Sequence, residues 1–375
     1  MRGDIVDRAD AAERLVGYDD KPEHERSVVN RVINIVVCAP IIGRNLDPIR
    51  AVDASLHVID GNDAFIAYQR AHKTQDTSAI RAADLEMHEL LAQAEVLCMM
   101  YPMVATAAAQ APNLRWLHHT QAGVSNLWAA DVWKRPEIII TSGRGHVRPT
   151  AIAEYCIAAA LSFSRGLHDG YLDKREGRLD VSHYAPQRVA GATMGVIGLG
   201  GIGKEVARLS KALGMRVVAT RRSVAAVEHD TDGADLLLPA AELSQLAAES
   251  DFIAVCTALT HETQAFLDSD FFSATTRRPL IVNISRGEVI DEDALLAALE
   301  QEQLRGAVLD VYAGELDARP PRRELLLQDN ILLTPHISGM GLRDDPAFMA
   351  LFCENLRRYA NDEPLLNLVD RDRGY

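Results

Sequence analysis

Hydrophobic residues in the first part of the chain fall into short apolar runs that alternate with stretches of helical character. The runs cover residues 32–38, 56–59, 96–99, 114–118 and 137–141. Parallel strands that are buried on both faces read as continuous apolar runs, so each run is predicted to be a buried β-strand. Helices are predicted at 85–94 and, as a long connection to the next part, at 150–165. The pattern indicates a first α/β domain.

A second series of apolar runs predicts further strands, at 193–197, 215–220, 235–238, 252–256, 280–283, 307–311 and 331–334. A helix is predicted over 202–213, because its apolar residues recur at helical spacing until Gly214 ends it. Another helix is predicted over 291–303, with acidic residues at its start as a cap. The alternation predicts a doubly wound parallel sheet, in which ligands bind beyond the carboxyl ends of the strands.

A glycine-rich turn joins the 193–197 strand to the 202–213 helix, with the sequence Gly198-Leu199-Gly200-Gly201-Ile202-Gly203. Gly198 is expected to make the tight turn, Gly200 to let the backbone approach a pyrophosphate, and Gly203 to let the helix pack closely on the strand. Helix N-terminal N–H groups then face the phosphates. The alternative is a turn without function, but the strand, helix and second strand around it favour a dinucleotide site.

The residues at the end of the 215–220 strand bear on the choice of cofactor. An acidic residue there would bind both ribose hydroxyls, but this chain has Thr220-Arg221-Arg222-Ser223. Guanidinium groups match phosphate geometry, and a hydroxyl adds a donor. The pattern favours NADP(H) and leaves NAD(H) possible; the alternative is that both arginines face solvent.

Three polar residues follow strands of the second series, namely Arg286, Glu315 and His336. Each alone has an ordinary structural explanation, but together they suit the reduction of a 2-oxo acid. Arg286 would hold the carboxylate and polarise the ketone, and His336 would supply the proton. A carboxylate on the far ring nitrogen, from Glu315, would fix the tautomer and stabilise the imidazolium.

Composition fits an enzyme and excludes several other classes. The chain has 375 residues, 48% of them apolar, which suffices for two domains. Its net charge of −14 argues against nucleic acid or an anionic membrane as partners. No signal-peptide or membrane-spanning run is found. The five cysteines include no CxxC pair, which fits a reducing cytoplasm and argues against a structural zinc site, so no metal is expected.

At these motifs the chain resembles the D-isomer-specific 2-hydroxyacid dehydrogenases. The match covers about residues 32–375 and runs in the same order along the chain: 189–191, 198–203, 259–263, 282–287, 291–295, 309–311 and 334–339. The resemblance implies two Rossmann-like domains, with a dinucleotide-binding domain inserted into a discontinuous flavodoxin-like substrate domain. The expected parts are an extension over 1–31, a substrate domain from 32–148 and 338–375, and a dinucleotide-binding domain at 149–337. The extension is expected to be partly helical over 10–16, and a returning helix is expected over 343–360.

The resemblance also implies residue roles. Arg286, Glu315 and His336 correspond to the catalytic Arg, Glu and His, and Asp310 to the residue that binds the nicotinamide carboxamide. The remaining expected cofactor contacts are Gly198, Gly200, Gly201, Ile202, Gly203, Thr220, Arg221, Arg222, Ser223, Cys256 and Thr257. The expected substrate contacts are Tyr101, Ala122, Gly123, Arg286 and His336. Family members are commonly homodimers.

Some positions depart from the family pattern and leave the substrate open. Gly201 stands where Arg is frequent, Cys256 where His is frequent, and Ser125 where Asp is frequent. Met100, Tyr101, His119 and His146 are candidates to shape the pocket, with ordinary packing as the alternative. The favoured activity is reduction of glyoxylate or hydroxypyruvate. The alternatives are hydride transfer from formate, which the carboxylate of Glu315 disfavours, and a nucleotide-sensing protein like the corepressors related to these enzymes.

Overall fold

The computed structural model describes residues 31–375 except 41–42, 75, 148, 179 and 341–345. The predicted extension, with its helix over 10–16, lies outside the described residues apart from Arg31, and so does the expected start of the last helix at Arg343. The chain divides into two units, Met1–Arg31 and Val32–Tyr375. The second unit contains two β-sheets. Within the described residues, no helix is both long and apolar enough to cross a membrane.

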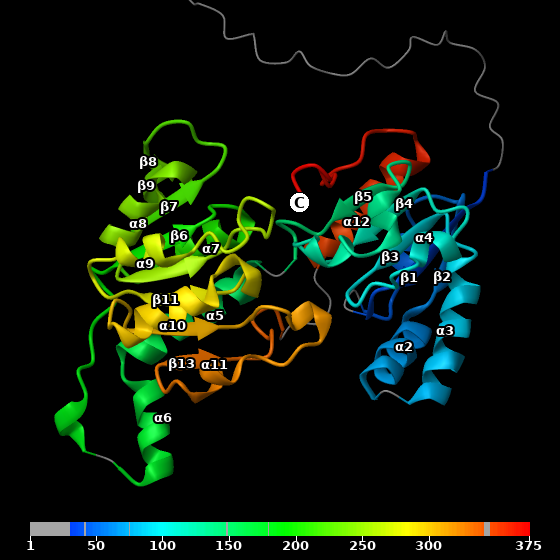
Figure 1. Cartoon of the computed structure of the whole chain (residues 1–375). Helices are drawn as coiled ribbons and strands as arrows, with labels where there is room; N and C mark the ends of the chain where they lie inside the picture. The colour runs from blue at the N-terminus through cyan, green and yellow to red at the C-terminus, as the bar shows by residue number, and fades with distance from the viewer. Residues whose placement is uncertain (1–30, 41–42, 75, 148, 179, 341–345) are drawn as a thin grey trace, which may run out of the picture. The chain divides into compact units, whose positions relative to one another are not determined.

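The first sheet is built from five parallel strands in the order β2-β1-β3-β4-β5 (Figure 1). Its strands are β1 (Ile33–Cys38), β2 (Leu56–Asp60), β3 (Val96–Met99), β4 (Trp116–His119) and β5 (Ile139–Ser142). The helices of this part are α1 (Asp47–Arg50), α2 (Asn62–Thr74), α3 (Thr77–Leu91) and α4 (Ala107–Gln110). This strand order is the flavodoxin-like one, as expected.

Two helices, α5 (Pro149–Ser164) and α6 (Leu167–Glu176), connect the first sheet to the second. The strands of the second sheet are β6 (Thr193–Ile197), β7 (Arg216–Arg221), β8 (Glu228–Thr231), β9 (Ala234–Pro239), β10 (Phe252–Val255), β11 (Leu280–Asn283), β12 (Gly306–Leu309) and β13 (Ile331–Leu333). Its helices are α7 (Gly201–Ala212), α8 (Leu243–Glu249), α9 (Ser269–Ser273), α10 (Glu292–Glu300) and α11 (Arg323–Leu327).

The second sheet has the order β13-β12-β11-β10-β6-β7-β9-β8 (Figure 1). All pairs are parallel except β8 with β9, a hairpin that was not predicted. Strand order reverses between β6 and β10, and a doubly wound sheet binds its ligand at this switch point. The predicted class, with two parallel α/β sheets of Rossmann type, is confirmed.

The last helix, α12 (Pro346–Ala360), returns to the first sheet, as predicted. Phe348, Phe352 and Leu356 on α12 are buried in one cluster with residues of β1 and with Trp116. Beyond the helix, Leu368 forms a β-bridge with Thr141. The segments that form the second sheet therefore lie, in the sequence, between the two segments that pack in or on the first sheet. The predicted domain boundaries themselves stay a prediction.

Several element ends were wrong. The helix predicted at 85–94 is α3 and begins at Thr77, because the Asp76 side chain accepts the N–H groups of Ser78 (2.9 Å) and Ala79 (3.2 Å). The helix predicted to reach 303 ends at Glu300. The helices α2 and α6 were not predicted, and their sequences are more polar on average than those of α3, α5 and α10.

Candidate functional site

A cavity of about 760 Å³ opens where the order of the second sheet reverses. The turn after β6, the Cys256-Thr257 segment after β10 and Arg286 after β11 all line it. From the first part of the chain, Ala122 and Gly123 also line it. Sequence positions that were singled out separately are thus brought to one cavity by the carboxyl ends of neighbouring strands.

The glycines of the turn have the geometry that a pyrophosphate needs. Gly198 has φ +96°, a conformation that favours glycine. A Cβ on Gly203 would lie 2.2 Å from the Gly198 carbonyl oxygen, so this glycine permits the close helix–strand packing. A Cβ on Gly200 would meet nothing within 4 Å and would project into open space. The described residues therefore fit a dinucleotide, whose phosphates can approach the backbone at Gly200.

Arg221, the last residue of β7, and Arg222 line the same cavity together with Thr220, whereas Ser223 does not. Arg221 forms an ion pair with Asp232 in the β8–β9 hairpin, and Arg222 lies 3.5 Å from a carboxylate oxygen of Glu262. The Nζ of Lys204, one residue after the glycine motif, is 3.0 Å from Asp232. Pairing with these cations lowers the pKa of Asp232. The sequence did not predict the roles of Lys204 and Asp232, because the β8–β9 hairpin, which brings Asp232 to both Arg221 and Lys204, was not predicted.

Arg286 reaches across to the first part of the chain. Its Nε donates to Ser125 Oγ at 3.3 Å, and a Cβ on Gly123 would lie 2.6 Å from the guanidinium. Another guanidinium nitrogen donates to the Ser285 carbonyl at 2.7 Å. Burial lowers the pKa of Arg286, while the nearby carboxylates of Glu315 and Glu288 oppose that shift. A fixed cation is therefore held directly beside the half-buried backbone of Gly123.

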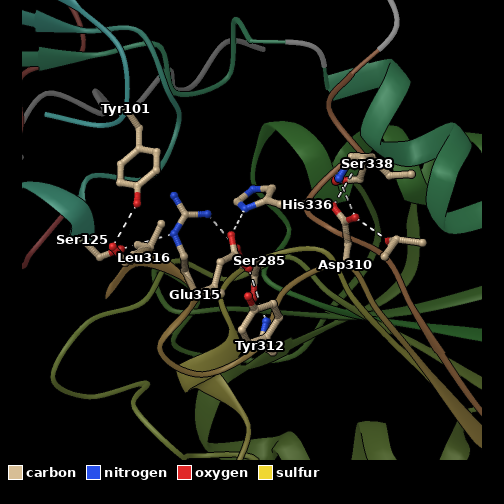
Figure 2. Close-up of polar contacts among 12 residues, drawn as sticks. Tyr101, Ser125, Ser285, Asp310, Tyr312, Glu315, Leu316, His336 and Ser338 are labelled. Carbon is tan, nitrogen blue, oxygen red and sulfur yellow. Dashed lines mark hydrogen bonds and ion pairs between the residues drawn. The ribbon is translucent and has the colours of Figure 1, made fainter. Parts of the chain in front are cut away.

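The ring Nδ1 of His336 is hydrogen-bonded to the carboxylate Oε1 of Glu315, and Figure 2 shows the ring pointing at Glu315. Because Nδ1 faces a carboxylate, that nitrogen carries a proton, and Nε2 is directed away from Glu315. The backbone of His336 has φ +55°, and its N–H donates to the Asp310 carbonyl at 2.9 Å. A loop held in this unusual conformation presents the imidazole.

Asp310 is fully buried and supports the His336 loop. Its carboxylate accepts the N–H groups of Ile337 (2.8 Å) and Ser338 (2.9 Å) and the hydroxyl of Thr334 (2.6 Å). Asp310, Glu315 and His336 are not in the lining of the 760 Å³ cavity, which Arg286 reaches. Contact of Asp310 with a nicotinamide carboxamide stays a prediction.

Three residues for which the sequence predicted no role at Glu315, namely Gly287, Glu288 and Glu292, hold the Glu315 loop in place. Glu288 accepts the N–H of Gly314, and Glu292 accepts the N–H of Ala313, each at 2.9 Å. A Cβ on Gly287 would lie 1.9 Å from the Tyr312 carbonyl carbon, so glycine is required next to Arg286. The Arg286 and Glu315 loops are thereby packed directly against one another.

The substrate candidates from the first part differ in their placement. The Tyr101 hydroxyl donates to the Leu316 carbonyl at 2.9 Å, beside Glu315 (Figure 2), but Tyr101 is not in the cavity lining. Met100 packs partly buried against the first-sheet core. His119 is fully buried and does not line the cavity, and His146 does not line it either. Among the described residues, no group of three or more His, Cys, Asp or Glu side chains could hold a metal ion.

Two buried histidines at the end of β4 are held neutral. Burial lowers the pKa of His119 to about 4, with the Arg286 charge adding to the shift. Burial likewise lowers the pKa of His118 to about 3. Trp116 Nε1 donates to Thr141 Oγ1 at 2.8 Å, so that hydroxyl is free to donate to His118 Nδ1 at 2.7 Å, which suits a neutral ring.

Because the pKa values of both histidines are lowered in the folded chain, we expect the free energy of unfolding to fall in mild acid. In the unfolded chain each binds a proton near pH 6.5, but the folded chain resists protonation until about pH 4. The unfolded state therefore binds more protons as the pH drops, and each ring costs about 1.4 kcal/mol of unfolding free energy per pH unit in that window. Urea unfolding at pH 7, 6 and 5 measures the slope.

The matched variant is His118→Asn, which removes one of the two titrating rings. Its unfolding free energy is lower at pH 7 but depends less steeply on pH between 6.5 and 4. An unchanged slope would contradict the assignment of the acid sensitivity to this ring.

The chain is similar to 2-hydroxyacid dehydrogenases and to reductases of 2-oxo acids. The family model described as "D-isomer specific 2-hydroxyacid dehydrogenase, NAD binding domain" matches residues 157–338. The chain is 29% identical to a glyoxylate reductase of Korarchaeum cryptofilum, over 72% of this chain and 80% of that one. It is 31% identical to the glyoxylate reductase/hydroxypyruvate reductase of Mus musculus, over 65% of this chain and 73% of that one. It spans 39% of a 30% identical D-3-phosphoglycerate dehydrogenase from Synechocystis.

Solved structures share the fold. A D-isomer specific 2-hydroxyacid dehydrogenase from Xanthobacter autotrophicus, in complex with NADPH and MES, matches with a TM-score of 0.70 and 24% identity over 92% of this chain and all of that one. An NADPH-dependent glyoxylate/hydroxypyruvate reductase from Sinorhizobium meliloti, in complex with NADP and sulfate, matches with a TM-score of 0.67 and 20% identity. The match covers 92% of this chain and all of that one. The chain belongs to the D-isomer specific 2-hydroxyacid dehydrogenase family. It is therefore a nicotinamide-dinucleotide-dependent oxidoreductase, as the resemblance implied.

Proposed function

We propose that the protein is an NADPH-preferring reductase of small 2-oxo acids, working through Arg286, His336 and Glu315. The observation that carries this proposal is the contact between His336, on the loop after β13, and Glu315, on the loop after β12. Arg286 lies near Glu315 and reaches the dinucleotide cavity. A fixed cation and a carboxylate-oriented imidazole are the two groups that reduction of a 2-oxo acid requires.

The contacts of each residue support the role proposed for it. Arg286 binds the substrate carboxylate and polarises the carbonyl oxygen, helped by the backbone N–H groups of the Ala122-Gly123 loop beside it. His336 donates a proton to the carbonyl oxygen from Nε2, and Glu315 stabilises the imidazolium through Nδ1. In the oxidative direction the same imidazole takes the proton back.

The dinucleotide would be held by the glycine turn, by the Cys256-Thr257 segment and by the end of β7. When bound there, the reduced nicotinamide supplies the hydride for the carbonyl carbon. Tyr101 is proposed to close the substrate side of the site, because its hydroxyl ties the loop after β3 to the loop that carries Glu315.

Relatives support a small substrate. Relatives of which the chain covers 73% to 81% are named glyoxylate reductase, hydroxypyruvate reductase and glyoxylate reductase/hydroxypyruvate reductase, which are names for enzymes of two- and three-carbon 2-oxo acids. We therefore propose glyoxylate or hydroxypyruvate as substrate. The phosphoglycerate relative contributes less, because the chain spans 39% of its length.

The preference for NADPH is proposed from Arg221 and Arg222, and the NADPH and NADP complexes of the two structural relatives are consistent with it. Replacing both arginines by Ala is expected to raise KM for NADPH by ~10- to 100-fold, because charge-assisted hydrogen bonds to the 2′-phosphate are lost. KM for NADH should change less than about threefold.

The matched control removes the competing carboxylate. Asp232→Asn leaves Arg221 and Lys204 unpaired and should lower KM for NADPH while leaving NADH unaffected. If the arginine variants raise both KM values equally, these side chains do not recognise a phosphate.

The substrate proposal is tested by following NADPH oxidation with glyoxylate, hydroxypyruvate, pyruvate and 2-oxobutyrate, and with glycolaldehyde as a control that lacks the carboxylate. Turnover of at least one acid and not of glycolaldehyde is expected. No turnover with any acid, together with tight cofactor binding, would favour a nucleotide-sensing protein instead.

Two other predictions accompany this proposal. A homodimer is proposed from the family resemblance, and the scattered free cysteines are consistent with a location in the reducing cytoplasm. Size-exclusion chromatography with light scattering tests the dimer.

A further inference from the structure

The side chain of Tyr375 lies between two arginines that come from different sheets. The Arg222 guanidinium carbon is 4.7 Å from the centroid of the Tyr375 ring, and that of Arg144 is 5.1 Å away. Arg222 follows β7, whereas Arg144 lies in the loop after β5. All three residues line the 760 Å³ cavity. An aromatic ring thus draws two cations together at the cofactor site of a strongly acidic chain.

The segment that carries Tyr375 is anchored to the first sheet. The Val369 N–H donates to the Ile140 carbonyl at 2.9 Å, and Arg371 donates to the Ile138 carbonyl at 2.6 Å. A short turn then closes on itself, since the Asp370 N–H donates to the Tyr375 carbonyl at 3.1 Å. The ring is therefore placed by the first sheet and contacts an arginine of the second.

The same corner has a further contact between the two parts. Trp128 stacks on His261, with ring centroids 5.2 Å apart and planes at 24°. Gly374 is buried against Trp128, and a Cβ there would lie 3.3 Å from the indole. Glu262, next to His261, is the carboxylate that faces Arg222. Arg222 is thus held on its face by Tyr375 and at its edge by Glu262.

We propose that Tyr375 determines specificity for a dinucleotide that bears a 2′-phosphate. Stacking fixes the plane of the Arg222 guanidinium and leaves its N–H edge available for a phosphate. A phosphate that replaces Glu262 at this edge would then be bound by an arginine already oriented by the first sheet. This inference rests on the proposed NADPH preference, and it assigns part of that preference to a residue outside the dinucleotide fold.

Direct binding tests the role without turnover. Dissociation constants are measured by calorimetry for adenosine 2′,5′-bisphosphate and for 5′-AMP, with the full-length chain and with Tyr375→Leu and Tyr375→Phe. Tyr375→Leu is expected to weaken binding of the bisphosphate by about three- to tenfold and of 5′-AMP by less than about twofold. Tyr375→Phe keeps the ring and should bind both like the unmodified protein.

A double-mutant cycle with Arg222→Ala separates this role from ordinary packing. In the Arg222→Ala background, Tyr375→Leu should have no further effect on bisphosphate binding. Equal weakening of both nucleotides by Tyr375→Leu, or no weakening at all, would overturn the role of Tyr375 while leaving the NADPH preference intact. If the unmodified protein binds both nucleotides equally, the NADPH preference fails and this inference fails with it.

Discussion

His336→Asn is expected to lower kcat for 2-oxo acid reduction by ~100- to 10,000-fold, because the amide cannot supply a proton in the reaction. Asn is the suitable replacement, since His336 has φ +55° and Asn tolerates left-handed backbone better than most residues. The backbone hydrogen bond from residue 336 to the Asp310 carbonyl can therefore persist. Steady-state kinetics with saturating NADPH measures the loss.

Two further measurements show whether the loss of kcat reflects the missing proton donor and not weaker cofactor binding or misfolding. The dissociation constant for NADPH, followed by its fluorescence, should stay within about twofold, because His336 does not line the dinucleotide cavity. His57→Asn, at an exposed position on β2, should behave like the unmodified protein. Full activity of His336→Asn would remove this imidazole from the mechanism.

Arg286→Lys should reduce kcat/KM for the 2-oxo acid by ~100- to 1,000-fold. Lysine retains the positive charge but cannot form the paired hydrogen bonds that a planar guanidinium makes to a carboxylate. It also cannot keep both the Ser125 and Ser285 contacts that orient Arg286 across the two parts of the chain. The variant is assayed with glyoxylate and hydroxypyruvate over a range of concentrations.

Ser125→Ala is the informative companion of Arg286→Lys, because it removes only the 3.3 Å contact to Nε. A loss of at most about tenfold is expected, since one modest hydrogen bond is removed and the charge remains. If Arg286→Lys kept full kcat/KM, the carboxylate of the substrate would have to be bound elsewhere.

The sequence predicts the architecture well because apolar runs and helical spacing are local signals. The strands β3, β6 and β11 have the predicted bounds, and both sheets have the predicted class. The ends of helices were predicted less well than the strands. The start of α3, for example, depends on the Asp76 cap, which is not part of the pattern of apolar residues. The positions of Arg286, Glu315 and His336 at strand ends follow from the topology of a parallel sheet.

The surroundings of these residues could not be predicted in the same way. Asp232 reaches Arg221 only because an added hairpin, β8–β9, folds back along β7. Tyr375 reaches Arg222 only because the chain returns to the first sheet. Each contact joins residues that no period or motif relates, so it depends on tertiary structure alone.

The most direct test compares kcat/KM for NADPH and NADH in one preparation, with glyoxylate and hydroxypyruvate as acceptors. We expect turnover of at least one acid and a kcat/KM for NADPH at least about tenfold above that for NADH, reflecting two arginines at the 2′-phosphate position. Equal or greater efficiency with NADH, or no turnover of either acid, would contradict an NADPH-preferring 2-oxo acid reductase.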